Sequence, residues 1–270
     1  MVQVEIIAIG NELLNGEVQD TNTHWLCQQI SGLGGRVRRA AMVRDDPAAI
    51  VAELRHALAR QAGLLFTTGG LGPTDDDLTL QAIAAATNRD WVLNAEALAQ
   101  VRAKYERLAE EGSVKTAEMT PARQKMAYLP AGASPLANPV GAAPGMLLRG
   151  EPWTIISLPG VPAELKGIFE ETLPTLLTEF FETGTYLNQL IIVNCGDESV
   201  LAPILREVSS RHPQVYLKSH ASAFGPEVKF RVTLSASGAA KSGVQELLAA
   251  TLKDLDQALN EAGISRDDEL

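Results

Sequence analysis

Strand-like and helical patterns alternate along the first third of the chain, and this alternation restricts the fold more than any other feature. Apolar runs at Val2–Ile9, Val37–Val43 and Leu64–Thr67 read as strands. Apolar residues at helical spacing separate them, in segments that begin near residues 21 and 47. Strands that alternate with helices of about a dozen residues are typical of a parallel sheet with helices on both faces. We therefore expect an α/β fold with a mostly parallel sheet.

The later part of the chain predicts further elements and a second domain. A helix is expected over 94–111, then a loop and a hairpin within 131–150, a strand at 153–158 and a helix at 163–177. After a linker at 182–185, the expected order is strand, helix, strand, strand and helix. Two adjacent strands between helices indicate a small α+β domain. We expect domains at 1–180 and 185–264, and a frayed, charged end at 265–270.

Charge and hydropathy exclude several classes of function. The formal net charge of −10 and the pI near 5.0 argue against a general nucleic-acid binder, which usually has a basic face. No apolar run approaches the roughly 18 residues of a membrane span. The first nine residues contain Glu5 and no basic segment, so they do not form a signal peptide. With Cys27 and Cys195 expected as buried free thiols, the chain is expected to be cytoplasmic.

The stretch from Leu64 to Thr79, LLFTTGGLGPTDDDLT, joins a strand to a helix through a glycine-rich turn. Glycines allow the backbone to come close to a ligand, and the first N–H groups of a helix have no partner within it. Such a turn is a site for an anion such as phosphate. We expect the donors for phosphate to come from the backbone and hydroxyl groups of Gly69, Gly70, Gly72, Thr74 and Thr79.

Three aspartates in the same stretch, Asp75, Asp76 and Asp77, conflict with a simple phosphate site because carboxylate and phosphate repel each other. A divalent cation between them resolves the conflict, and Mg²⁺ is typically bound by carboxylates, water and ligand phosphates. One aspartate at a helix start is explained by capping, and Asp75 is expected in that role. We expect Asp76 and Asp77 to hold the cation.

Two more acidic turns follow the first and second strands, at the sheet edge where ligands bind in folds of this class. Glu12 follows the first strand and is either a metal ligand or a solvated turn residue. Asp46 is the natural cap of a helix that begins with Pro47, which leaves Asp45 free to reach the site as a ligand or a base.

The remaining expected phosphate and nucleotide contacts lie in other turns. Asn11 stands beside Glu12, and Lys125 is either a phosphate contact or a solvated surface charge. Pro159 and Gly160 form the turn between the later strand and helix, and are expected to line the nucleotide side.

The C-terminal order of elements resembles RNA-binding KH modules in outline, but the residues do not favour RNA. The GxxG loop of those modules is absent, since the segment Gly196-Asp197-Glu198-Ser199 does not supply it. Residues 185–264 contain seven Lys or Arg and eight Asp or Glu, so there is no basic excess to hold a phosphate backbone. We expect no nucleic-acid partner.

Four motifs resemble one family in order and spacing: GNELLNGEVQDTN, GGLGPTDDDLT, NPVGAAPG and LPGVPAEL. They resemble the molybdopterin-binding (MoaB/Mog-like) domain of the CinA, competence/damage-inducible, family over about residues 2–175. The resemblance implies a three-layer α/β/α fold, a pocket for a small nucleotide or pterin, and a small KH-like domain after it. The chain ends near residue 270 without the C-terminal deamidase domain of full-length CinA, so nicotinamide-mononucleotide deamidation is not expected of it.

The resemblance implies a metal-dependent pyrophosphatase that acts on ADP-ribose-like dinucleotides, with Mg²⁺, Mn²⁺ or Co²⁺ as cofactor. Asp77 matches the key aspartate of the motif, and Asp45 matches the aspartate after the second strand. Mog-type relatives, which join molybdopterin to AMP, have arginine at the position of Asp76, and an acidic residue there favours binding phosphate through a cation.

Two alternatives remain open: a molybdopterin adenylyltransferase or insertase, and a pterin- or nucleotide-binding module without catalysis. Relatives of this kind often self-associate as homo-oligomers. The apolar face of the expected 94–111 helix is explained equally by self-association and by core packing.

Overall fold

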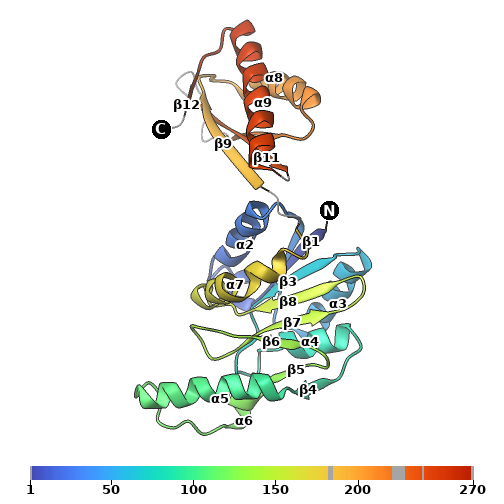
Figure 1. The fold of residues 1–270 in the computed structure, drawn as a ribbon, viewed down its shortest axis with the longest axis vertical. Coiled ribbons are helices and arrows are strands. Elements are labelled where there is room, and N and C mark those ends of the chain that lie inside the picture. Colours follow the sequence, from blue (N-terminus) through green and yellow to red (C-terminus); the bar gives the residue numbers. More distant parts are fainter. Residues whose placement is uncertain (1, 182–184, 221–228, 239, 269–270) are drawn as a thin grey trace. The chain divides into compact units, whose positions relative to one another are not determined.

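The computed structural model describes residues 2–181, 185–220, 229–238 and 240–268, which divide into two compact units. The larger unit comprises residues 1–30 and 35–181, and the smaller comprises residues 31–34 and 182–270 (Figure 1). The linker expected at 182–185 falls outside the described residues except for Thr185, which begins a strand.

The larger unit is built on a six-stranded sheet with the strand order β2-β1-β3-β8-β7-β6 (Figure 1). Its strands are β1 (Gln3–Ile9), β2 (Arg36–Val43), β3 (Leu64–Thr68), β6 (Ser134–Leu136), β7 (Gly145–Arg149) and β8 (Thr154–Leu158). The pairs among β2, β1, β3 and β8 are parallel, whereas β7 pairs antiparallel with both β8 and β6. The mostly parallel sheet and the hairpin within 131–150 are therefore both confirmed.

Helices cover both faces of this sheet, which makes three layers (Figure 1). The helices of this unit are α2 (Thr21–Gly32), α3 (Pro47–Ala59), α4 (Thr79–Ala86), α5 (Ala95–Glu110) and α7 (Pro162–Leu177), with short α1 (Asn11–Leu14) and α6 (Pro121–Lys125). Ile7 and Leu65 of the sheet share one buried core with Leu54 of α3 and Ile83 of α4. On α2 and α7, the rings of Trp25 and Phe169 meet edge to face with centroids 5.0 Å apart. The three-layer α/β/α class is confirmed.

Helix α5 packs its apolar face against the core of the same unit. Ala97 and Val101 are buried, and Leu98 and Tyr105 are partly buried against the same cluster. The two-stranded antiparallel sheet of β4 (Trp91–Leu93) and β5 (Tyr128–Pro130) lies next to α5 along the chain. Core packing therefore covers Val101 and part of Leu98 and Tyr105, and self-association through this helix stays a prediction.

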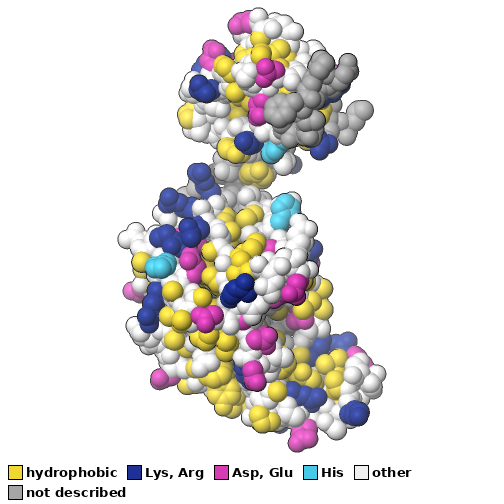
Figure 2. Space-filling model, turned by 180° about the vertical axis from the view of Figure 1, so that it is seen from behind, with side chains coloured by type: hydrophobic (Ala, Val, Ile, Leu, Met, Phe, Trp, Pro, Cys, Tyr) yellow, Lys and Arg dark blue, Asp and Glu magenta, His cyan; other side chains and the backbone are white. Residues whose placement is uncertain are grey.

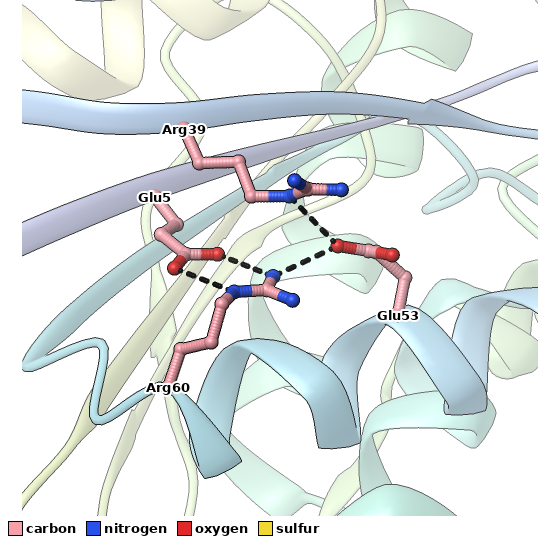
Figure 3. A network of polar contacts seen from close by, with 4 residues as sticks. All are labelled: Glu5, Arg39, Glu53 and Arg60. Carbon is pink, nitrogen blue, oxygen red and sulfur yellow. Dashed lines mark hydrogen bonds and ion pairs between the residues drawn. The ribbon is translucent and has the colours of Figure 1, made fainter.

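A charged network ties the first strand to the end of α3 (Figure 3). Glu5 on β1 is only 4% exposed, and its two carboxylate oxygens accept hydrogen bonds of 3.0 and 2.6 Å from Nε and Nη2 of Arg60. Glu53 on α3 joins Arg60 at 2.9 Å and Arg39 of β2 at 3.4 Å. A buried carboxylate requires such a partner, so Arg60 ties β1 to the end of α3.

Two local expectations at helix starts need correction. Asn11 and Glu12, expected in a turn, begin the short helix α1. The aspartates 75–77 lie in a turn before α4, whose N-cap is Leu78 without a side-chain cap, so Asp75 does not cap it. The cap expected of Asp46 is confirmed, because its carboxylate accepts a hydrogen bond of 2.7 Å from the N–H of Ala49 in α3.

The smaller unit contains a four-stranded antiparallel sheet with the order β10-β11-β9-β12. Its elements are β9 (Thr185–Val193), α8 (Glu198–Arg211), β10 (Tyr216–His220), β11 (Phe230–Gly238), α9 (Lys241–Glu261) and β12 (Arg266–Asp268). The expected frayed end is wrong for residues 266–268, which pair with β9. Charge pairs hold this strand, from Arg266 to Asp256 at 2.5 Å and from Lys229 to Asp267 at 3.1 Å.

Basic and acidic side chains both occur on the face drawn in Figure 2, with hydrophobic side chains between them. None of the described helices is long and apolar enough to cross a membrane. Both cysteines are free thiols, but only Cys195 is buried, since Cys27 is half-buried.

Candidate functional site

A cavity of about 580 Å³ lies in the larger unit at the carboxyl ends of β1, β2, β3 and β8. This is the edge at which parallel sheets bind ligands, and the volume is in the range of small-molecule sites. It brings together these residues expected from the sequence: Glu12, Asp45, Gly69, Gly70, Gly72, Asp76, Asp77, Pro159 and Gly160. The cavity lining does not include Asn11, Thr74, Thr79 or Lys125.

Gly69 is the residue at which the glycine loop leaves β3. Its φ of 93° is in the left-handed region, and a Cβ at this position would collide with the carbonyl oxygen of Ile9. Its N–H donates a hydrogen bond of 3.0 Å to the carbonyl of Leu158. Gly69 therefore joins the ends of β1, β3 and β8, and its N–H is not available for the phosphate contact expected from the sequence.

Donors for an anion remain farther along the loop. The N–H groups of Gly70 and Gly72 have no hydrogen-bond acceptor within the part of the chain that the structure describes. A Cβ at position 72 would lie only 2.6 Å from a carboxylate oxygen of Asp77, and glycine avoids this collision. The absence of a side chain at Gly72 thus lets Asp77 come close to the loop backbone.

Thr79 lies beneath the loop and does not face the cavity. Its side chain is fully buried, its hydroxyl donates a hydrogen bond of 2.8 Å to the carbonyl of Gly69, and its N–H donates to the carbonyl of Gly70 at 3.2 Å. The expectation that Thr79 contacts phosphate is therefore replaced by a role in holding the glycine loop on α4.

Asp76 and Asp77 converge on one residue, Thr74. The Thr74 hydroxyl contacts a carboxylate oxygen of Asp76 and another of Asp77, the second at 2.7 Å, and the Thr74 N–H donates to Asp77 at 2.8 Å. The hydroxyl hydrogen bond is the main cause that lowers the pKa of Asp76, with a smaller effect from the charge of Lys125. Thr74 thus gathers two carboxylates, instead of presenting its own donors to a phosphate.

Lys125, at the end of α6, reaches the same loop. Its Nζ donates a hydrogen bond to the carbonyl oxygen of Thr74. Lys125 therefore holds the aspartate-bearing turn, and it does not line the cavity as the expected phosphate contact would.

Asp45 lines the same cavity as this turn and is half-buried. Burial is the main cause that raises the pKa of its carboxyl, and the nearby charges of Glu12, Asp76 and Asp77 raise it further. A hydrogen bond of 2.7 Å from the Asn11 N–H acts in the opposite direction. Asn11 therefore contacts the site through Asp45, and its N–H is not free for a ligand.

Glu164 also lines the cavity, although the sequence reading did not single it out. It stands in the first turn of α7, directly after the turn Pro159–Gly160, so the motif LPGVPAEL contained the signal. Its carboxylate accepts a hydrogen bond of 2.7 Å from Nδ2 of Asn138 in the motif NPVGAAPG. Ala142 and Ala143 of that motif line the cavity as well, which agrees with the loop expected near the site.

The carboxylates around the cavity are ligands that a hard cation prefers, but they do not form a complete coordination site by themselves. Among the described residues, no three His, Cys, Asp or Glu side chains lie close enough together to hold a metal ion. Mg²⁺ sites commonly use one or two carboxylates and complete the coordination with water and ligand phosphates. Burial is the main cause of the raised pKa of Asp45, and the charges of Glu12, Asp76 and Asp77, which raise it further, are ones that a cation would offset. The residues therefore fit a cation that binds together with a phosphate ligand.

Comparison with known families gives one match, to a probable molybdopterin-binding domain, over residues 5–178. This range contains every residue of the cavity. A protein of Pyrobaculum arsenaticum is 42% identical over 219 residues, which cover 81% of this chain and 80% of the relative. A protein of Aeropyrum pernix is 42% identical over 255 residues, which cover 93% of this chain and 90% of the relative.

A solved structure is similar to the chain as well. The crystal structure of the protein CinA, of unknown function, from Thermoplasma acidophilum is 35% identical in sequence and has a TM-score of 0.57. The similar region covers 62% of this chain and 94% of that one.

Proposed function

Because the chain belongs to the family of probable molybdopterin-binding domains and is a relative of CinA, we propose that its acidic cavity binds a dinucleotide and hydrolyses the pyrophosphate bond. The substrate class is that of ADP-ribose, and the reaction depends on a divalent cation such as Mg²⁺, Mn²⁺ or Co²⁺. The observation that carries the proposal is the position of Asp45, Asp76 and Asp77 around a glycine loop in one cavity.

The loop and the carboxylates have separate parts in this proposal. The N–H groups of Gly70 and Gly72 donate hydrogen bonds to the phosphates, while Pro159 and Gly160 line the nucleotide side. Asp76 and Asp77 would hold the cation, with water and the ligand phosphates as its other ligands, and Glu12 would add negative charge at the same cavity. The cation, when bound, neutralises the negative charge of the pyrophosphate and favours attack by water.

Asp45 is the base in the proposed reaction. A water molecule attacks one phosphorus atom, its proton passes to the Asp45 carboxylate, and the bond to the bridging oxygen breaks so that the other phosphate leaves. The raised pKa of Asp45 supports this role, because a general base is most effective when its pKa approaches the working pH. Its hydrogen bond from Asn11 keeps the carboxylate oriented.

A panel of dinucleotides tests the proposal. The purified chain is incubated with ADP-ribose and other dinucleotide pyrophosphates, each with Mg²⁺, Mn²⁺ or Co²⁺, and the phosphate-containing products are separated. AMP and ribose 5-phosphate from ADP-ribose, formed only with a divalent cation, are the expected result. If none of the substrates yields a product with any of the metals, the proposal is contradicted.

The family match favours a second candidate, in which the cavity binds a pterin phosphate. The same residues serve either ligand, because both carry phosphate groups. Release of AMP from an adenylated pterin, or tight pterin binding without turnover of any dinucleotide, would favour this second function over the first.

A further inference from the structure

Glu164 lines the large cavity and has no role in the proposed hydrolysis. Its place along the edge of the sheet follows from the strand order β2-β1-β3-β8. Asp45 follows β2, the glycine loop follows β3, and the turn that leads to Glu164 follows β8. Neighbouring strands are about 4.8 Å apart, so roughly 14 Å separates the ends of β2 and β8. A diphosphate at the glycine loop therefore lies between the turn of Asp45 and the first turn of α7.

The carboxylate of Glu164 is held at one oxygen and free at the other. Its Oε2 accepts a hydrogen bond of 2.7 Å from Nδ2 of Asn138, and it passes so close to Gly141 that a Cβ there would collide with it. Its Oε1 has no hydrogen-bond partner among the described residues and keeps accessible surface. A ligand in the cavity can therefore reach a carboxylate oxygen that accepts hydrogen bonds.

Asn138 decides which kind of atom residue 164 must turn toward it. Its Oδ1 accepts hydrogen bonds from the N–H groups of Val140 at 3.0 Å and Gly141 at 2.8 Å. Its Nδ2 donates to the carbonyl oxygen of Ala143 at 2.8 Å as well as to Glu164. An amide turned the other way would place its nitrogen against two N–H donors, so the group that faces residue 164 is a donor. Residue 164 must therefore present an acceptor to Asn138.

The loop that carries the motif NPVGAAPG is also fixed by other contacts. Nζ of Lys104 in α5 donates a hydrogen bond of 2.7 Å to the carbonyl oxygen of Val140. Pro139 lies against α7, where a Cβ at Gly167 would come within 2.9 Å of its Cγ. Anchoring this loop therefore does not by itself require the carboxylate of Glu164.

Helix capping does not explain the carboxylate either. A glutamate at the third position of a helix can cap it by accepting a hydrogen bond from the N–H of the N-cap residue. Val161 is the N-cap of α7, but within the described residues the side chain of Glu164 accepts its one hydrogen bond from Asn138. Negative charge in the first turn of a helix is favourable, yet it does not need this contact. The arrangement is typical of a carboxylate that is positioned for a ligand.

A carboxylate repels phosphate and binds hydrogen-bond donors. In a dinucleotide the donors beside the diphosphate are sugar hydroxyls, and the amino group of the base lies beyond them. We propose that Glu164 determines specificity by accepting a hydrogen bond from one of these groups, on the β8 side of the diphosphate, with Asn138 as the residue that positions it. The dinucleotide is that of the proposed function, on which this role of Glu164 rests.

Thermal-shift titrations with four ligands test this role without requiring turnover. The ligands are ADP-ribose and three analogues, which lack the ring hydroxyls of the adenosine ribose, the ring hydroxyls of the terminal ribose or the amino group of the base, at a fixed Mn²⁺ concentration. We expect one analogue to bind about 10-fold or more weakly than ADP-ribose, since a hydrogen bond to a charged group is lost, and that analogue identifies the group. Equal affinities for all four ligands would overturn the proposal, and so would a wild type that binds none of them.

Glu164→Gln removes the free acceptor with little change of shape. Because Asn138 donates to residue 164, the glutamine turns its amide oxygen toward Asn138 and its NH₂ group replaces the free carboxylate oxygen. We expect a melting temperature close to that of the wild type, while the ratio of affinities between ADP-ribose and the discriminated analogue falls to about one. Glu170→Gln on the same helix is the matched control, since Glu170 is exposed and does not line the cavity, and it is expected to keep the wild-type ratio.

Two other roles of Glu164 predict different results. A residue that only anchored the loop would, when replaced, weaken the binding of all four ligands equally, so an unchanged ratio in the folded variant would overturn the proposal. A ligand of the cation would, when replaced, reduce the stabilisation by Mn²⁺ alone, and this loss in Glu164→Gln would overturn the proposal as well.

Glu164→Ala covers the case in which Glu164→Gln does not fold, and it too is expected to lose the discrimination. Discrimination by the wild type without hydrolysis would leave the role of Glu164 standing and reject the proposed reaction. Hydrolysis of ADP-ribose by a wild type that binds all four ligands equally would do the reverse.

Discussion

The carboxylate of Asp45 accepts a hydrogen bond of 2.7 Å from the backbone N–H of Asn11. This bond joins the turn after β2 to the first turn of α1, so the two acidic turns that follow β1 and β2 form one wall of the cavity. It also keeps in place a carboxylate whose pKa is raised by burial and by Glu12, Asp76 and Asp77.

Asp45→Asn is expected to slow hydrolysis while stabilising the protein in the absence of a cation. Loss of a general base lowers the rate of hydrolysis by about 100-fold or more. The neutral amide keeps an acceptor for Asn11 but removes a charge that the folded state holds poorly at neutral pH. Product release and thermal unfolding in a chelator measure the two effects, and a variant that is less stable at neutral pH would contradict the electrostatic part.

The pH dependence of stability follows from the same carboxyl. Its pKa in the folded state is raised above the ordinary value of 3.8, so the folded state binds the proton more tightly than the unfolded state. The contribution of Asp45 to the free energy of unfolding therefore falls as pH rises from 3.8 through the folded-state pKa. Urea unfolding of wild type and Asp45→Asn across this range should show the difference between them growing with pH, whereas a constant difference would contradict the assignment.

Divalent cations are expected to stabilise the wild-type protein against heat. A cation at 100 times its dissociation constant adds about 2.7 kcal/mol to the free energy of unfolding. The double variant Asp76→Asn, Asp77→Asn should lose most of this gain, because the carboxylates gathered by Thr74 are gone. Asp75→Asn is the matched control, since Asp75 is in the same turn but does not line the cavity, and an equal loss in this control would contradict the assigned ligands.

Arg60→Met is expected to destabilise the larger unit by about 2–3 kcal/mol, because it leaves Glu5 buried without its partner. The side chain of Arg60 is 36% exposed, so water screens part of the pair and the loss falls below that of a fully buried one. Arg39→Met removes a contact of 3.4 Å from a half-exposed side chain and should cost less than about 1 kcal/mol. Urea unfolding compares the two, and equal losses would argue against the importance of Glu5 burial (Figure 3).

Much of the fold and the position of the site followed from local patterns in the sequence. The spacing of strands and helices in the first 70 residues predicts the parallel sheet, because apolar period and turn residues decide these elements locally. Since the carboxyl ends of parallel strands share one edge, the turns with Glu12, Asp45 and Asp77 were expected to meet there, and all three line one cavity.

The details that could not be predicted depend on contacts between distant residues. The N–H of Gly69 donates a hydrogen bond to the carbonyl of Leu158, some 90 residues away, and no local sequence pattern predicts that bond. Residues 266–268 look like a charged, frayed end, yet they pair with β9, and Asp267 also forms an ion pair with Lys229. Glu164 was missed for a different reason: its place in the first turn of α7 follows from Pro162 and could have been read from the sequence.

Hydrolysis of ADP-ribose by the wild type and by Asp77→Asn, with Mn²⁺ present, tests the central claim most directly. Asparagine can still accept the hydrogen bonds from Thr74, so the turn is expected to keep its shape and the melting temperature without cation should change little. We predict AMP and ribose 5-phosphate from the wild type and a rate at least about 100-fold lower from the variant, because a charged ligand of the cation is lost. Equal rates for the two proteins would contradict the account.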